Sequence, residues 1–208
     1  ALPALRKYRD LGAKEIVTAS TGNHGAAASW AARQLEMRAT VFAPHGASRE
    51  KLSRIESAGG EIRLVGQDLD EAKDAARRDA ESRSVPFFED GAEPAQYSGY
   101  GTIASEIVDE LGEDLGAVVV PTGNGALSGG IGLVLRKRAP SARVIAAIAK
   151  SAPVMALSYA AEHAVPCEEM ETFADGLAVR VAIPSAVALM TRVVDEVRLV
   201  SERKIAGA

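Results

Sequence analysis

The sequence predicts an α/β fold with two doubly wound parallel-sheet domains, the smaller formed by residues 14–90 and the larger by residues 1–13 and 91–208. Two observations predict this class. Short β-type runs alternate with amphipathic segments of helix length, which is the rhythm of βαβ units. The composition, with 47% hydrophobic and 25% charged residues, is that of an ordinary globular protein. A chain of this kind buries a core and is neither fibrous nor disordered.

The smaller domain is expected to contain three strands with helices between them. The predicted strands are 15–19, 39–43 and 61–65, and the predicted helices are 24–36, 48–58 and 68–83. The last of these helices keeps its alanines at helical spacing among many charges, so we expect it on a surface. A short strand at 86–88 then leads into a polar loop at 89–98 that contains Gly and Pro, which we expect to be the domain boundary.

The larger domain is expected to repeat the same alternation. Residues 2–8 also look helical. The predicted helices are 101–111, 127–138, 152–161 and 184–192, the predicted strands are 117–121, 143–149 and 195–200, and 162–180 is predicted to be irregular.

Charge and composition exclude several classes of function. Lys and Arg number 24 against 28 Asp and Glu, a net charge of −4, and aromatic residues make up 4%. A nucleic-acid binder needs a basic surface and stacking side chains, so no nucleic-acid partner is expected. Apolar runs are far shorter than the ~20 residues of a membrane span. A single cysteine, Cys167, rules out an internal disulfide framework and fits the cytoplasm, and the histidines have no partners at metal-ligand spacing.

The first candidate site is the turn between strand 15–19 and the helix after it. It reads Ser20-Thr21-Gly22-Asn23-His24 and combines hydroxyls, an amide and an imidazole. Ligands of open α/β sheets bind at the carboxyl ends of strands, and the first N–H groups of a helix attract anions. A carboxylate or phosphate site is therefore predicted. The same residue types are good helix N-caps, so a capped helix without a ligand is the alternative.

The second candidate site is the glycine-rich turn after strand 117–121. It runs Gly123-Asn124-Gly125-Ala126-Leu127 and lets several N–H groups converge on a phosphate. No Gly-Lys-Ser/Thr follows, so the turn is not a P-loop. The dinucleotide fingerprint also fails, because the strand that follows ends in Lys150 and not in an acid. An NADP site is a weaker reading, and a plain tight turn is the alternative without a ligand.

Together, the two turns resemble the substrate and phosphate loops of the fold-type II pyridoxal-phosphate (PLP) enzymes, the tryptophan synthase β-subunit-like fold. This family includes threonine and serine dehydratases, serine racemase and threonine synthase. The resemblance covers essentially the whole chain in order. Further blocks that carry it are Ala39-Thr40-Val41-Phe42-Ala43-Pro44, Lys51-Leu52 with Gly59-Gly60-Glu61, Gly99-Tyr100-Gly101-Thr102 with Glu106-Ile107, and Thr172-Phe173-Ala174-Asp175-Gly176-Leu177-Ala178.

The resemblance implies a role for each residue of the two turns. Asn23 is expected to hydrogen-bond the ring hydroxyl oxygen of PLP. The substrate carboxylate is expected at four residues, Ser20, Thr21, Gly22 and His24. The five residues from Gly123 to Leu127 are expected to hold the cofactor phosphate, in a cleft between the two domains. The implied reaction deaminates threonine or serine to a 2-keto acid and ammonia.

The resemblance also implies a catalytic lysine that the chain lacks. The family carries it in a Ser-Phe-Lys-x-Arg-Gly type block upstream of the first helix, and this chain opens at Ala1 as if cut from something longer. The residue facing the pyridine nitrogen is likewise expected beyond Ala208. Lys150 is a remote candidate and Thr21 a weak one, so the catalytic residue is unknown and the chain alone is expected to be inactive.

Other activities stay open at this point. Threonine synthase-like β-replacement, serine racemisation and a non-catalytic fragment or binding module are the alternatives. Relatives in the family are commonly dimers, which implies a homodimer, and the implied small-molecule partner is an amino acid.

Overall fold

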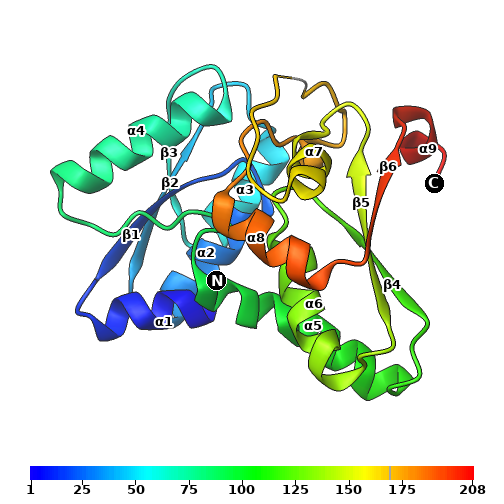
Figure 1. The fold of residues 1–208 in the computed structure, drawn as a ribbon. Coiled ribbons are helices and arrows are strands. Elements are labelled where there is room, and N and C mark those ends of the chain that lie inside the picture. Colours follow the sequence, from blue (N-terminus) through cyan, green and yellow to red (C-terminus); the bar gives the residue numbers. More distant parts are fainter. Residues whose placement is uncertain (169) are drawn as a thin grey trace. The chain divides into compact units, whose positions relative to one another are not determined.

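The computed structural model describes residues 1–168 and 170–208, so Glu169, in the predicted irregular segment, lies outside the described residues. The chain is an α/β protein with two three-stranded parallel sheets, as predicted (Figure 1). It divides into two compact units, Ala1–Ala95 and Gln96–Ala208. The division places residues 1–13 with the first unit, and the two predicted domains, 14–90 and 1–13 plus 91–208, stay a prediction.

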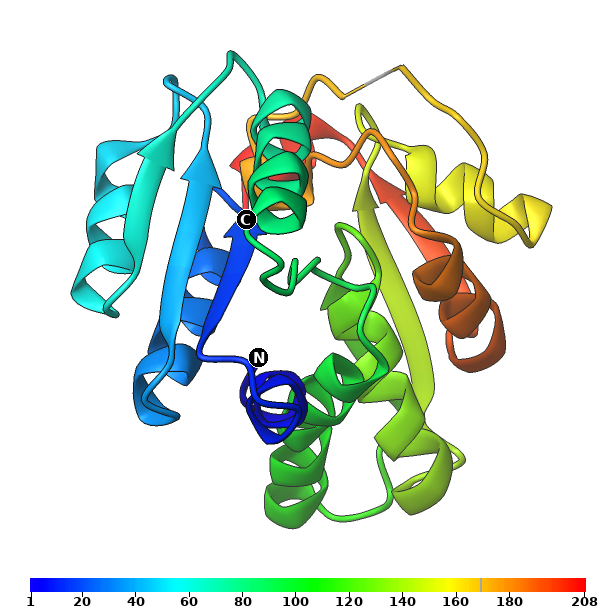
Figure 2. The ribbon, with the colours of Figure 1, turned by 90° about the vertical axis from the view of Figure 1, so that its left-hand side faces the viewer.

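The first unit is built on a sheet in the order β1-β2-β3. The strands are β1 (Glu15–Ala19), β2 (Arg38–Ala43) and β3 (Glu61–Leu64), and the helices are α1 (Leu2–Asp10), α2 (Asn23–Gln34), α3 (Arg49–Ser57) and α4 (Leu69–Ser82). In Figure 2, α3 and α4 lie on opposite sides of this sheet. Helices on both faces are the doubly wound arrangement.

Alternation along β1 explains the two faces of this sheet. Ile16 lies in a buried cluster with alanines of α1 and α2, whereas its neighbour Val17 lies in a cluster with Ala72 and Ala76 of α4. Successive side chains of a strand point to opposite faces, so Ile16 and Val17 of β1 contribute to the core on opposite faces of the sheet. The predicted strand at 86–88 is reduced to one parallel bridge, between Val17 and Phe87, because a proline at 86 has no N–H for the ladder.

The second unit is built on a sheet in the order β4-β5-β6. The strands are β4 (Ala117–Pro121), β5 (Arg143–Ala149) and β6 (Glu196–Val200). The helices are α6 (Ala126–Arg138), α7 (Val154–Ala161), α8 (Pro184–Val193), the short α9 (Glu202–Ala206) and a 3₁₀ turn at Asp175–Leu177. Val144, Ala146 and Ile148 of β5 are buried in a single cluster to which α6, α7 and α8 all contribute.

Helix α5 corrects one prediction. The loop predicted at 89–98 is shorter, because α5 runs from Pro94 to Leu111 and begins seven residues before the predicted start at Gly101. Proline at the first position favours a helix start. The helix continues through Gly101. A Cβ at this position would lie 2.7 Å from a methyl of Val134 and 3.2 Å from the Gly130 carbonyl oxygen of α6, which is too close for a larger residue. The glycine therefore permits close helix packing, a reason that local sequence does not reveal.

Candidate functional site

The turn between β1 and α2 is organised by the Ser20 side chain. Ser20 is buried, and its Oγ accepts hydrogen bonds from the N–H groups of Gly22, at 3.1 Å, and Gly25, at 3.0 Å. A Cβ on Gly25 would lie 2.9 Å from Ile55 and 3.1 Å from the Ser20 Cβ, so the helix start is packed too closely for a larger residue. Ser20 therefore shapes the turn from within.

The outer side of the same turn presents donors. Among the described residues, no hydrogen bond to a protein acceptor is formed by the N–H groups of Thr21, Asn23 and His24 or by the side chains of Thr21 and Asn23. Unpaired N–H groups at the positive end of a 12-residue helix suit an anion. Chemically, this turn can bind a carboxylate, as the sequence predicts.

The His24 side chain lies away from these donors. It is 8% exposed, its Nε2 lies 2.9 Å from the Thr18 hydroxyl, and its Nδ1 lies 3.3 Å from Asp90. The ring also packs on Phe88, with 4.9 Å between the ring centroids. His24 therefore offers a ligand its backbone N–H, while its side chain is committed to the protein interior. Asp90, which sequence reasoning missed, is a new member of this site.

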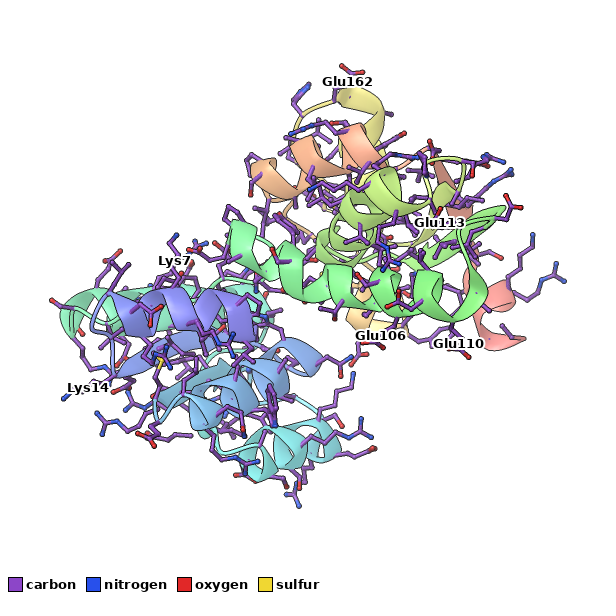
Figure 3. All side chains as sticks on the ribbon, turned by 90° about the horizontal axis from the view of Figure 1, so that it is seen from below. Lys7, Lys14, Glu106, Glu110, Glu113 and Glu162 are labelled. Carbon is purple, nitrogen blue, oxygen red and sulfur yellow. The ribbon has the colours of Figure 1, made fainter. Side chains whose placement is uncertain are left out.

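Lys51 is a second residue that sequence reasoning did not place. Its Cδ lies 3.6 Å from the point that a Cβ of Gly22 would occupy, so this half-buried side chain borders the donor turn. The sequence offers no local signal for this contact, because 29 residues separate the two positions. By contrast, Lys7 and Lys14 point outward from the first unit in Figure 3, and Lys150 is exposed as well.

The second turn, between β4 and α6, has the properties of a phosphate cradle. Gly125 adopts a left-handed conformation with φ +88°, and the Asn124 side chain accepts a hydrogen bond of 3.0 Å from the Ala126 N–H. In the described part of the chain, the N–H groups of Gly123, Gly125 and Leu127 have no protein acceptor. The helix behind them has 13 residues, so its dipole adds to the attraction for an anion.

The segment containing the 3₁₀ turn packs against this cradle. A Cβ on Gly123 would lie 2.8 Å from the Gly176 carbonyl oxygen, so only a glycine fits there. The segment is held by Glu202, which accepts hydrogen bonds from the Thr172 hydroxyl, at 3.0 Å, and from the Phe173 N–H, at 3.4 Å. The second unit thus brings Gly176, which follows Asp175 in the sequence block, beside the predicted phosphate loop.

Comparison with known proteins identifies the family. The family model described as "Pyridoxal-phosphate dependent enzyme" matches residues 1–208. The chain belongs to this family of PLP-dependent enzymes. The second turn has the features that the phosphate of PLP requires. The N–H groups of Gly123, Gly125 and Leu127 have no acceptor among the described residues, and Gly123 has no side chain that would fill the space.

The relatives of this chain within the family include threonine-deaminating enzymes. The chain is 34% identical over 200 residues to the L-threonine ammonia-lyase of Geobacter sulfurreducens, and the aligned region covers 96% of the chain and 50% of that protein. It is 32% identical to the mitochondrial threonine dehydratase of Saccharomyces cerevisiae, and here the aligned region covers 93% of the chain and 34% of that protein. The chain therefore spans half or less of the length of these relatives.

Solved structures of the family have the same fold. The processed form of threonine deaminase isoform 2 from Solanum lycopersicum superposes with a TM-score of 0.88 at 29% identity, covering 96% of this chain and 59% of that one. Maize serine racemase superposes with a TM-score of 0.87 at 26% identity, covering 96% and 60%. The predicted PLP-enzyme fold is thus confirmed.

Two further properties concern the described residues as a whole. None of the helices in that part of the chain is long and apolar enough to cross a membrane. The His, Cys, Asp and Glu side chains described form no group of three or more that is arranged to hold a metal ion.

Proposed function

We propose that the full-length product of this gene is a PLP-dependent lyase that deaminates threonine or serine to a 2-keto acid and ammonia. One observation carries the proposal: two strand-to-helix turns each present N–H groups without protein acceptors. A PLP-dependent reaction of an amino acid needs two such anion sites, one for the substrate carboxylate and one for the cofactor phosphate. The threonine-deaminating relatives support the choice of reaction.

The proposed roles follow from the donors in each turn. The N–H groups of Thr21, Asn23 and His24 bind the substrate carboxylate, with the Thr21 hydroxyl as a further donor, and Ser20 and Gly22 hold that turn in shape. The N–H groups of Gly123, Gly125 and Leu127 bind the phosphate, whereas that of Ala126 is already bonded to the Asn124 side chain.

The proposed cofactor supplies the chemistry that side chains lack. When bound, PLP acts as an electron sink that makes the Cα proton of an amino acid removable. We propose that the Asn23 amide holds the ring hydroxyl oxygen of the cofactor. Lys150 is a poor nucleophile here, since it is exposed and a reactive lysine needs a desolvated site. We therefore propose that the 208 residues by themselves are inactive.

A spectroscopic and product assay tests the function. Full-length protein with PLP is expected to show the absorbance of bound cofactor and to release 2-oxobutanoate from threonine. D-serine formation from L-serine would favour racemisation, and consumption of a phosphorylated hydroxy amino acid would favour β-replacement. Cofactor absorbance without any of these products would indicate that the protein is a non-catalytic binding module. The absence of cofactor absorbance would refute the proposal.

We propose in addition that the full-length protein is a homodimer, as family members commonly are, and that it is cytoplasmic, as its single cysteine suggests. Light scattering of the purified protein and fractionation of cells test these two points. A monomeric mass, or recovery in an organelle or membrane fraction, would contradict them.

A further inference from the structure

The His24 side chain joins the donor turn to a segment 64 residues further along the chain. Its Nε2 lies 2.9 Å from the Thr18 Oγ1 and 3.4 Å from the Phe88 carbonyl oxygen, and its Nδ1 lies 3.3 Å from the Asp90 carboxylate. All four residues belong to the first unit. The link therefore connects β1, the first turn of α2 and the chain just before α5.

The hydrogen-bond partners of Nε2 determine that this ring nitrogen carries a hydrogen. The Thr18 hydroxyl is fully buried and lies 2.6 Å from the Phe88 carbonyl oxygen, a contact that requires its single hydrogen to lie between the two oxygens. Thr18 Oγ1 can then only accept from His24. Since both groups facing Nε2 are acceptors, Nε2 carries a hydrogen.

The second ring nitrogen faces a group that, when ionised, only accepts. A neutral ring with its hydrogen on Nε2 would direct the Nδ1 lone pair at the Asp90 carboxylate, and the two would repel. A hydrogen on Nδ1 turns this contact into an ion pair inside a site where the ring is 8% exposed. The arrangement is thus satisfied in full by the imidazolium form.

We infer that His24 is a positioning residue for the carboxylate-binding turn, and that it holds this turn in its binding conformation when it is protonated and joined to Asp90. His24 supplies one of the turn's free N–H groups from its own backbone, so the contacts of its ring with Thr18 and Asp90 anchor the residue that carries this donor. This inference rests on the proposed carboxylate role of the turn.

Other polar and charged groups lie around this link. On α1, the Tyr8 hydroxyl donates to Glu93 at 2.5 Å, and the Tyr8 ring packs edge-on against Phe88. Burial raises the pKa of Tyr8, and the bond to Glu93 raises it further, so the Tyr8 hydroxyl stays protonated at neutral pH. Lys7 lies 3.6 Å from Glu93, and Glu89 pairs with Arg77 and Lys73 of α4.

Nuclear magnetic resonance of the 208-residue chain tests the protonation directly, without cofactor or activity. Long-range ¹H–¹⁵N spectra report each imidazole nitrogen, and His24→Gln assigns the His24 signals. From the hydrogen-bond geometry, both His24 nitrogens are expected to be protonated in the folded chain. An unprotonated Nδ1 under these conditions would overturn the inference, even if the proposed reaction were later demonstrated.

A binding experiment on the same chain tests the positioning role. Sodium propionate, the simplest suitable carboxylate probe, is expected to shift the amide signals of Thr21 and Asn23. His24→Gln keeps a donor for Thr18 but loses the pair with Asp90. It is expected to weaken propionate binding about tenfold.

Two further variants separate positioning from folding. Asp90→Asn, at a 32% exposed position, is expected to reproduce the His24→Gln result, and the double variant is expected to be no weaker than either single one. The control His45→Gln changes an exposed loop histidine and is expected to leave binding unaltered. The positioning role would be refuted by additive effects of the two variants, by unaltered propionate binding in His24→Gln, or by the absence of propionate shifts in the wild-type chain. In full-length protein, His24→Gln should raise KM about tenfold with kcat nearly unchanged.

Discussion

The glycine at the start of α6 offers a quantitative test of the backbone conformation and packing of the second turn. Gly125 has a φ of +88°, and a Cβ there would lie 2.7 Å from the Met190 sulfur and 3.0 Å from the Met155 methyl. A left-handed conformation costs an L-residue about 1–2 kcal/mol. Overpacking costs about 1–3 kcal/mol, with the lower end expected for flexible methionines. Gly125→Ala should therefore destabilise the protein by about 2–4 kcal/mol.

Two other glycines separate the conformational cost from the packing cost. Gly12 has a φ of +94°, and a Cβ there would have no atom within 4 Å, so Gly12→Ala should cost only about 1–2 kcal/mol. Gly46 has open space and no positive φ, so Gly46→Ala should change stability by about 0.5 kcal/mol or less. Urea unfolding followed by far-ultraviolet circular dichroism measures all three. Equal losses for Gly125→Ala and Gly12→Ala would refute the packing argument.

Further predictions concern the donor turn and two carboxylates whose pKa values are lowered by their hydrogen bonds. Ser20→Ala removes the acceptor of two N–H groups and should cost about 1–2 kcal/mol in urea unfolding, whereas Ser20→Thr should recover part of the loss; no loss would contradict the shaping role. Glu15→Gln should cost about 1–3 kcal/mol, because it weakens bonds from Arg83 and Thr40; an unaltered midpoint would argue against it. Asp195→Asn should flatten the acid limb of the stability curve, and a curve like that of wild type would count against this.

The sign of the pH effect follows from the direction of the pKa shifts. Burial raises the pKa of Glu15, but hydrogen bonds from Arg83 and Thr40 outweigh it and hold the pKa below its usual value. Burial likewise raises the pKa of Asp195, and the bonds from the Val144 N–H and Arg136 reverse the shift. A depressed folded-state pKa adds stability above the unfolded pKa, near 4, and this stability is lost as the pH falls through the lower folded value. Thermal unfolding between about pH 6 and pH 3 checks this sign.

The sequence by itself determined the elements and the position of the two turns. Strands 15–19, 117–121 and 143–149 are found with the predicted bounds, because each is a short run rich in apolar or β-branched residues and is followed by a polar residue. The helix predicted at 68–83 is found as α4, and Asp68 caps it by accepting a hydrogen bond from the Glu71 N–H. In the same way, the residue types of the two turns already indicated anion sites.

Tertiary structure decided what lies around those turns. The contact of Lys51 with Gly22 and the pairing of His24 with Asp90 each join residues 29 or more positions apart. The early start of α5 depends on close packing with another helix. Local composition carries no signal for such contacts, since they arise only when βαβ crossovers bring distant segments to one sheet edge. The residues that can form an anion site could therefore be predicted from the sequence, whereas the groups that orient them could be identified only from the folded structure.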